Sequence, residues 1–202
     1  SASSGGHANV VDLLLNVNNV NVNVANSGGA TGLYQACFKG HCNVVDTLLK
    51  RVTIDVNKAE DEEGCTPLYI ASQKAHVDIV RALLIRDDID VNKAEVDGCT
   101  PLYTATENGH MEIVQLLLAH KNMDINASMS DGQSPLHVAA ETGHVGIISL
   151  LLKAGTNTLN NRVIENSLID PTCSGLTPLG IALKNNQDEA VQLLKESGAR
   201  YK

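Results

Sequence analysis

The residues of this chain best suited to chemistry are its histidines, and they recur at a regular spacing of 34 or 35 residues. The recurring positions are His7, His41, His76, His110 and His144. Imidazole side chains bind metal ions, but the ligands of one zinc ion must converge within a few ångströms of it. Because each repeated unit has one histidine at the same position, the histidines are spread along the chain and do not form a cluster. The spacing therefore predicts a hydrogen bond in each unit, made at a helix start or to a neighbouring loop, and no metal site.

Cysteines are a second class of reactive residue, and their number is odd. They are Cys37, Cys42, Cys65, Cys99 and Cys173. Cys65 and Cys99 both precede a Thr-Pro pair and lie one repeat apart. Packed helices are about 10 Å apart, which is too far for a disulfide between these two positions. We expect free, half-buried thiols in a cytoplasmic protein, because the cytosol keeps thiols reduced.

Catalytic motifs are missing from the sequence. There is no G-x-S-x-G, no GxGxxG and no phosphate-binding loop. Carboxylate pairs occur at Glu62-Glu63 and Asp87-Asp88, in expected loops where solvated charge is the simpler interpretation. The sequence thus predicts no catalytic residue, no cofactor and no enzymatic activity.

Charge and hydropathy narrow the choice of partners. The chain has 15 basic and 23 acidic residues, a net charge of −8, which disfavours binding to nucleic acid. The same charge suits a protein partner with a basic surface. No apolar run approaches the roughly 18 residues of a membrane-spanning helix, so we expect no membrane insertion.

A short motif recurs together with the histidines and indicates how they are positioned. Thr66-Pro67-Leu68-Tyr69 returns at residues 100–103 and, as Ser-Pro-Leu-His, at 134–137, with a variant form at 31–34 and a later Thr-Pro-Leu-Gly copy at 177–180. Thr suits a helix N-cap and Pro the first helical position, and the glycine that precedes all but one of the recurring histidines suits a left-handed helix stop. The Leu-Leu run after each histidine predicts a second helix. Such short helices are marginal alone, so each unit must pack against the next.

The motif Thr-Pro-Leu-[Tyr/His]-x-Ala-x-x-x-Gly-His, followed by Leu-Leu and Asp-[Val/Ile]-Asn, resembles the ankyrin repeat. The resemblance covers almost the whole chain and implies an all-α solenoid of stacked helix-turn-helix units with short β-hairpin fingers. The expected divisions of a single domain, 1–202, are a half repeat at 1–22, repeats at about 23–56, 57–91, 92–125 and 126–173, and a C-terminal capping repeat at 174–202.

Several features depart from the family pattern. The units run 34 or 35 residues where the family has about 33, and Tyr34, Tyr69 and Tyr103 replace its usual histidine. Ala75 stands where glycine stops the other first helices, at a cost of around 1 kcal/mol. The front half repeat has no polar cap, so we expect a monomeric domain within a longer chain that carries more repeats upstream.

An insertion at about residues 157–173 lengthens one connection by nine residues relative to its counterpart. Insertions in repeat proteins emerge as loops on one face. This loop is either a tolerated surface feature or an added contact for a partner.

The resemblance implies binding at the hairpin tips and on the exposed side of the first helices, which line a concave groove. The positions that differ between units on these surfaces are Phe38, Lys39, Glu60, Asp61, Glu62, Glu63, Gln73, Lys74, Glu95, Val96, Asp97, Glu107, Asn108, Met129, Asp131 and Glu141. Phe38 is either an interface anchor or a residue packed beneath a neighbouring finger. The expected function is recognition of a partner protein. The alternatives are a targeting or regulatory domain of a larger enzyme or effector, and a structural spacer without a specific ligand.

Overall fold

The computed structural model describes residues 2–17, 20–157, 172 and 175–199. Over these residues it contains eleven α-helices and one isolated β-bridge, between Ala25 and Thr31. The chain forms two compact units, Ser1–Val96 and Asp97–Lys202. In both units, a first helix follows each Thr-Pro-Leu motif and a second helix follows each Gly-His pair. The all-α prediction is confirmed.

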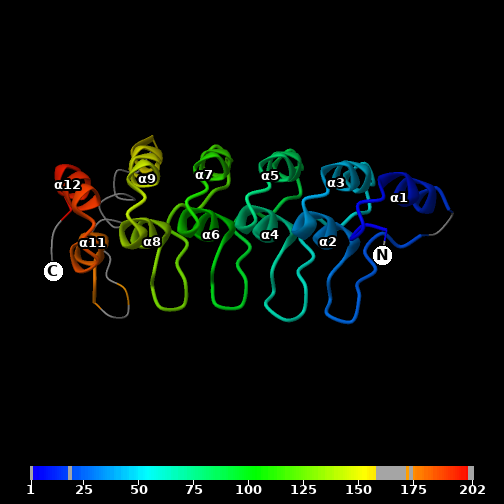
Figure 1. Cartoon of the computed structure of the whole chain (residues 1–202), viewed down its shortest axis with the longest axis horizontal. Helices are drawn as coiled ribbons and strands as arrows, with labels where there is room; N and C mark the ends of the chain where they lie inside the picture. Colours follow the sequence, from blue (N-terminus) through cyan, green and yellow to red (C-terminus); the bar gives the residue numbers. More distant parts are fainter. Residues whose placement is uncertain (1, 18–19, 158–171, 173–174, 200–202) are drawn as a thin grey trace. The chain divides into compact units, whose positions relative to one another are not determined.

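Unit 1 contains two first helices and three second helices, which lie in two rows (Figure 1). The first helices are α2 (Gly32–Lys39) and α4 (Pro67–Gln73), and the second helices are α1 (Ala8–Leu15), α3 (Cys42–Leu49) and α5 (Val77–Leu84). Helix α2 contacts both α3 and α4, while α3 contacts α1 and α5. Each helix is therefore held by its partner in the repeat and by its neighbour in the row.

Unit 2 repeats this arrangement with three pairs of helices. Its first helices are α6 (Pro101–Glu107), α8 (Pro135–Thr142) and α11 (Pro178–Lys184), and its second helices are α7 (Met111–Leu118), α9 (Val145–Asn157) and α12 (Asp188–Glu196). Helix α8 contacts α6, α9 and α11, and α9 contacts α7 and α12. The same two-row packing thus holds the second unit together.

The ends of the first helices form as the sequence predicts. The Thr66 hydroxyl accepts a hydrogen bond from the Tyr69 amide at 3.1 Å, and Pro67 occupies the first helical position, where no amide donor is needed. At the other end, Gly40 adopts the left-handed conformation with φ 75°. Ala75 takes the same conformation with φ 61°, so the repeat imposes this turn even on a residue with a side chain.

Small aliphatic side chains fill the space between the two rows. Leu68 of α4 and Ile79 and Leu83 of α5 are fully buried. Each such group shields the hydrophobic surface of its neighbours, which no single helix pair could do alone.

The hairpin fingers differ from the expected β-structure. In the described residues, their paired backbone forms no named strand, only the Ala25–Thr31 bridge and single closing bonds such as Glu60 N–H to the Cys65 carbonyl at 3.1 Å. Few β-forming residues flank the tips, so each finger is a hairpin loop and not a strand pair.

The insertion expected at 157–173 lies almost entirely outside the described residues, which resume with the buried Thr172. Helix α9 extends through Asn157, where the insertion was expected to begin. The repeat boundaries and the division as one domain stay predictions.

Candidate partner-binding surface

The recurring histidines link neighbouring repeats. His41 Nε2 lies 3.1 Å from the Ser4 carbonyl oxygen, and His144 Nε2 lies 3.3 Å from that of Glu107. Gln187 replaces histidine in the last repeat and donates to the Glu141 carbonyl at 3.1 Å. The predicted loop-bridging bond is confirmed at His41 and His144. Within the described part of the chain, no three His, Cys, Asp or Glu side chains are grouped to hold a metal ion.

The cysteines in the described residues, Cys37, Cys42, Cys65 and Cys99, form no disulfide. Burial, together with the neighbouring Glu63 carboxylate, raises the pKa of Cys65 to about 12. Burial also raises the pKa of Cys37. Thiolates are the nucleophilic form of cysteine, so neither side chain is suited to covalent chemistry. Cys173 lies outside the described residues.

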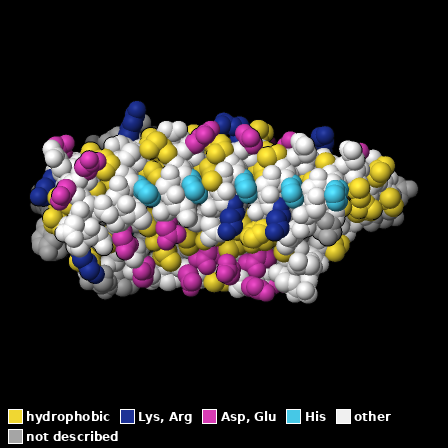
Figure 2. All heavy atoms as spheres, in the orientation of Figure 1, with side chains coloured by type: hydrophobic (Ala, Val, Ile, Leu, Met, Phe, Trp, Pro, Cys, Tyr) yellow, Lys and Arg dark blue, Asp and Glu magenta, His cyan; other side chains and the backbone are white. Residues whose placement is uncertain are grey.

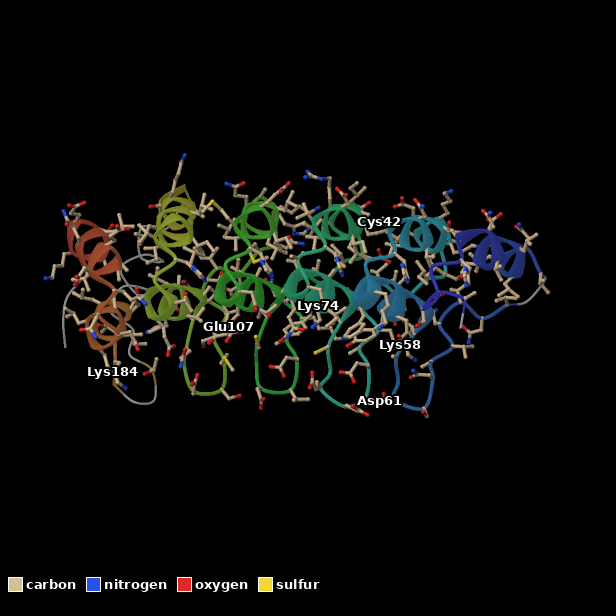
Figure 3. The ribbon with its side chains drawn as sticks, viewed as in Figure 1. Cys42, Lys58, Asp61, Lys74, Glu107 and Lys184 are labelled. Atoms are coloured by element: carbon tan, nitrogen blue, oxygen red, sulfur yellow. The ribbon has the colours of Figure 1, made fainter. Side chains whose placement is uncertain are left out.

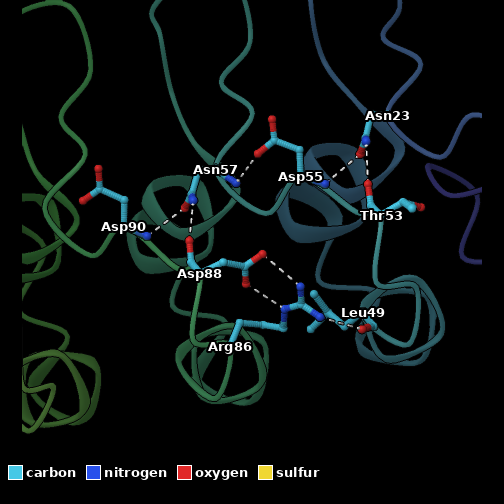
Figure 4. Close-up of polar contacts among 8 residues, drawn as sticks. All are labelled: Asn23, Leu49, Thr53, Asp55, Asn57, Arg86, Asp88 and Asp90. Carbon is cyan, nitrogen blue, oxygen red and sulfur yellow. Dashed lines mark hydrogen bonds and ion pairs between the residues drawn. The ribbon is translucent and has the colours of Figure 1, made fainter.

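A ladder of asparagine and aspartate side chains ties the bases of the hairpin loops together in unit 1 (Figure 4). Asn57 donates to the Asp88 carbonyl at 2.7 Å and accepts from the Asp90 amide at 2.8 Å. Asn23 makes the same pair of bonds to Thr53 and Asp55. The sequence reasoning missed this role, although the recurring Asp-[Val/Ile]-Asn motif carried its signal.

The hairpin tips are joined by backbone hydrogen bonds. In unit 1, the Asp61 amide donates to the Gly28 carbonyl at 3.0 Å, and the Val96 amide donates to the Glu63 carbonyl at 2.9 Å. In unit 2, the Ser130 amide donates to the Asp97 carbonyl at 3.0 Å. Together with the ladder, these bonds fix the tips before any partner binds, which lowers the entropy cost of binding.

One tip is longer than its counterparts, and we name its exposed carboxylates, Asp61, Glu62 and Glu63, the acidic tip. Its closing bond runs from Glu60 N–H to the Cys65 carbonyl, five residues on, whereas the bonds from Asn26 to Ala30 and from Met129 to Gln133 span four. Figure 3 shows Asp61 at the end of this loop.

Glu60 lies in the same tip but points inward. Its carboxylate accepts hydrogen bonds from the amides of Glu62, Glu63 and Cys65 at 2.8–2.9 Å. Partial burial acts in the opposite direction, yet these amide donors lower the pKa of Glu60 overall. This geometry gives Glu60 a structural role in holding the longer loop.

Phe38 and two lysines form a second cluster in unit 1, which we name the aromatic–lysine cluster. Phe38 is 37% exposed. Lys39 Nζ lies 5.0 Å and Lys74 Nζ 5.4 Å from the ring centroid, both within cation–π range. Lys74 sits at the end of α4 (Figure 3), and Gln73 beside it is half-buried.

The remaining predicted residues are distributed over both units. In unit 1, Glu95 is half-buried and Val96 is 68% exposed. In unit 2, Asn108 is exposed but donates to the Thr104 carbonyl in its own helix at 2.8 Å, and Met129 is half-buried.

The predicted site residues of unit 2 include four exposed carboxylates, Asp97, Glu107, Asp131 and Glu141. The pKa of Tyr103 is raised first by burial and then by the charge of Glu107, with Asp131 and Glu141 adding to the effect. The Tyr103 hydroxyl donates to Gln133 Oε1 at 3.2 Å. On the face shown in Figure 2, acidic side chains gather over the hairpin loops, and some of the basic side chains lie next to the row of histidines.

Comparison with known proteins identifies the repeats. The family model for ankyrin repeats matches the chain in three copies, at residues 1–95, 84–163 and 132–202. None of the curated proteins compared with the chain matches it. Among the described residues, no helix combines the length and the apolar content needed to cross a bilayer.

Proposed function

The chain belongs to the ankyrin-repeat family, and on that premise we propose that it recognises a partner protein through its hairpin tips and the exposed side of its first helices. Ankyrin repeats as a class are protein-interaction units. The proposal adds which surfaces of this chain make the contact and what chemistry the partner presents.

One observation carries the proposal: the variable side chains stand on a scaffold whose polar backbone groups are already paired. Asp61 and Glu63 belong to a tip held by bonds to the Gly28 carbonyl and the Val96 amide. Their carboxylates are exposed and are not needed for those bonds. Exposed charge on a fixed loop favours specific contacts, because little loop ordering is required on binding.

The charges indicate the partner. The acidic tip in unit 1 and the exposed carboxylates of unit 2 favour a partner with a basic surface. The aromatic–lysine cluster offers a different contact, with an exposed ring and two ammonium groups within cation–π range of it. Phe38 is the expected anchor, because binding energy concentrates in a few large side chains.

The first experiment identifies the partner by proximity labelling with the intact protein, and then measures binding of that partner to Phe38→Ala. We expect affinity to fall by about 2 kcal/mol or more with nearly unchanged thermal unfolding. Ile85→Ala is the matched control, because Ile85 is 78% exposed at the end of α5 and outside the proposed surface. Loss of stability with unchanged affinity contradicts the role of Phe38. A failure to label any specific partner favours a spacer.

The second experiment tests charge. Neutralising the acidic tip with D61N, E62Q and E63Q is expected to slow association and flatten its dependence on salt. The control neutralises three exposed carboxylates on second helices, Asp12, Asp46 and Asp78, with the same change in net charge. Equal effects of the two triple variants would show that net charge alone governs association.

A further inference from the structure

The aromatic–lysine cluster presents two positive charges to solvent. Lys39 and Lys74 are exposed, and among the described residues no salt bridge joins either lysine to a carboxylate. Their ammonium groups lie 5.0 and 5.4 Å from the centroid of the exposed Phe38 ring. An ammonium group has three N–H donors, so contact with the ring leaves donors of both lysines available to a partner.

The position that these lysines occupy, at the end of a first helix, is used differently in unit 2. There it holds Asn108, Thr142 and Asn185, none of them charged. Each donates to the carbonyl four residues back in its own helix, at 2.8, 2.8 and 3.0 Å. In unit 1, Lys39 and Lys74 extend over the Phe38 ring instead. Closing the helix therefore does not require a lysine here, and the two charges are extra to the packing of the repeat.

The backbone under Phe38 lacks a bond that its equivalents have. His41, His144 and Gln187 each bond the carbonyl of the residue two positions before the left-handed glycine of the preceding repeat. For His76 the equivalent carbonyl is that of Phe38, yet among the described residues the buried His76 Nε2 has no hydrogen-bond partner. A buried polar atom without a partner costs stability. Such a departure from a repeated pattern is expected where residues serve binding and not packing.

The ligand that fits this cluster is a carboxylate next to an apolar side chain. Two ammonium groups attract an anion, and the Phe38 ring offers apolar surface beside them. The chain has a net charge of −8, and the acidic tip belongs to the same unit. A singly charged carboxylate meets less repulsion from these acidic side chains than a doubly charged phosphate does.

The acidic tip and the cluster are close enough for one short peptide to reach both. Figure 3 shows Asp61 at the end of the hairpin loop and Lys74 at the end of α4. The loop at 61–66 spans at most about 20 Å when fully extended, and residues 67–74, α4 and its C-terminal cap, add about 12 Å. An extended peptide of about ten residues covers this total.

We infer that the aromatic–lysine cluster binds an acidic residue of the partner protein, next to an apolar one, in a segment that also carries the basic residues for the acidic tip. The carboxylate pairs with Lys39 and Lys74, and the apolar side chain covers Phe38. This inference rests on the proposed function and adds to it the order of charges in the partner: acidic and apolar at one end, basic at the other.

The test is a selection of random peptides of about twelve residues, displayed on phage, against the intact chain. We expect the enriched peptides to carry aspartate or glutamate beside an apolar residue, with lysine or arginine within about ten residues. A second selection uses the double variant K39E and K74E, which should replace the acidic residue by a basic one. The control, K50E with K121E, makes the same change in net charge at exposed sites outside the first helices and should retain the acidic residue.

The affinity of one selected peptide is then measured against K39Q with K74Q, which removes the two charges without reversing them. We expect binding to weaken by about tenfold or more, since the charge-assisted hydrogen bonds are lost. The thermal unfolding midpoint should stay unchanged, because both side chains are exposed.

Three results overturn the inference. Peptides that carry only basic residues, and bind K39E with K74E as well as the unaltered chain, overturn it and leave the proposed function standing. A selection that yields no binding peptide contradicts both. A gain of more than about tenfold when phosphoserine replaces the acidic residue also overturns it, because a phosphate is then the preferred ligand.

Discussion

Asn57 tests whether the side-chain ladder stabilises the stack of repeats. Its amide group makes two hydrogen bonds to the next loop, to the Asp88 carbonyl at 2.7 Å and from the Asp90 amide at 2.8 Å. Asn57→Ala removes both bonds and leaves the backbone groups of Asp88 and Asp90 to water. A hydrogen bond contributes about 0.5–1.5 kcal/mol, and exposed partners favour the lower half of that range. We therefore expect the free energy of unfolding to fall by about 1–2 kcal/mol.

The assay is thermal and urea unfolding followed by far-UV circular dichroism, with an expected fall in the midpoint of about 2–8 °C. Asn43→Ala is the matched control, because Asn43 is exposed on α3 and its side chain bridges no loops in the described structure. Asn57→Asp adds a second comparison. It retains an acceptor for the Asp90 amide but directs a carboxylate at the Asp88 carbonyl, so it should also destabilise the fold.

The result that refutes this reasoning is an Asn57→Ala midpoint within error of that of Asn43→Ala. In that case, packing between helices would couple the repeats, and the hydrogen bonds of the ladder would add no measurable stability. Asn23→Ala provides an internal check, because Asn23 makes the equivalent bonds to Thr53 and Asp55.

Two further predictions concern single positions in unit 1. Glu60→Gln should lower the free energy of unfolding by about 1 kcal/mol at neutral pH, since hydrogen bonds to a charged acceptor are the stronger ones. The folded-state pKa of Glu60 is lowered, so its contribution is present above the ordinary glutamate pKa and is lost as pH falls through the folded-state value. The two proteins should thus converge in acid unfolding curves; a gap that stays constant contradicts this role. Ala75→Gly should raise the free energy of unfolding by about 0.5–1 kcal/mol, because glycine relieves the left-handed strain at φ 61° but adds freedom to the unfolded chain. A lower unfolding midpoint for Ala75→Gly would show that the alanine side chain contributes packing that outweighs the strain.

The repeated motifs were enough to predict the helices and their ends. Thr66, Pro67 and Gly40 act through local backbone geometry, which depends on residue type and on neighbours within a turn. The histidine bonds were also predictable in kind, because each imidazole occupies the same place in its unit. Because the sequence repeats at a fixed period, the same local structure forms in every repeat.

Other features depend on where long side chains point, which periodicity does not determine. Glu60 belongs to an acidic run, yet its carboxylate turns inward to three amides. Phe38 was recognised as unusual, but the placement of both ammonium groups over its ring required the structure.

The additional residue of the acidic tip has a consequence for how this chain can change. The interval from each recurring histidine to the next asparagine is constant, as from His41 to Asn57 and from His76 to Asn92. The surplus residue falls beyond the asparagine, inside the closing bond of Glu60 and Cys65. The helical frame therefore keeps a constant spacing while the projecting loops are free to vary in length. New contact specificities can evolve in this protein by insertion at the tips, without any adjustment of the packed interior.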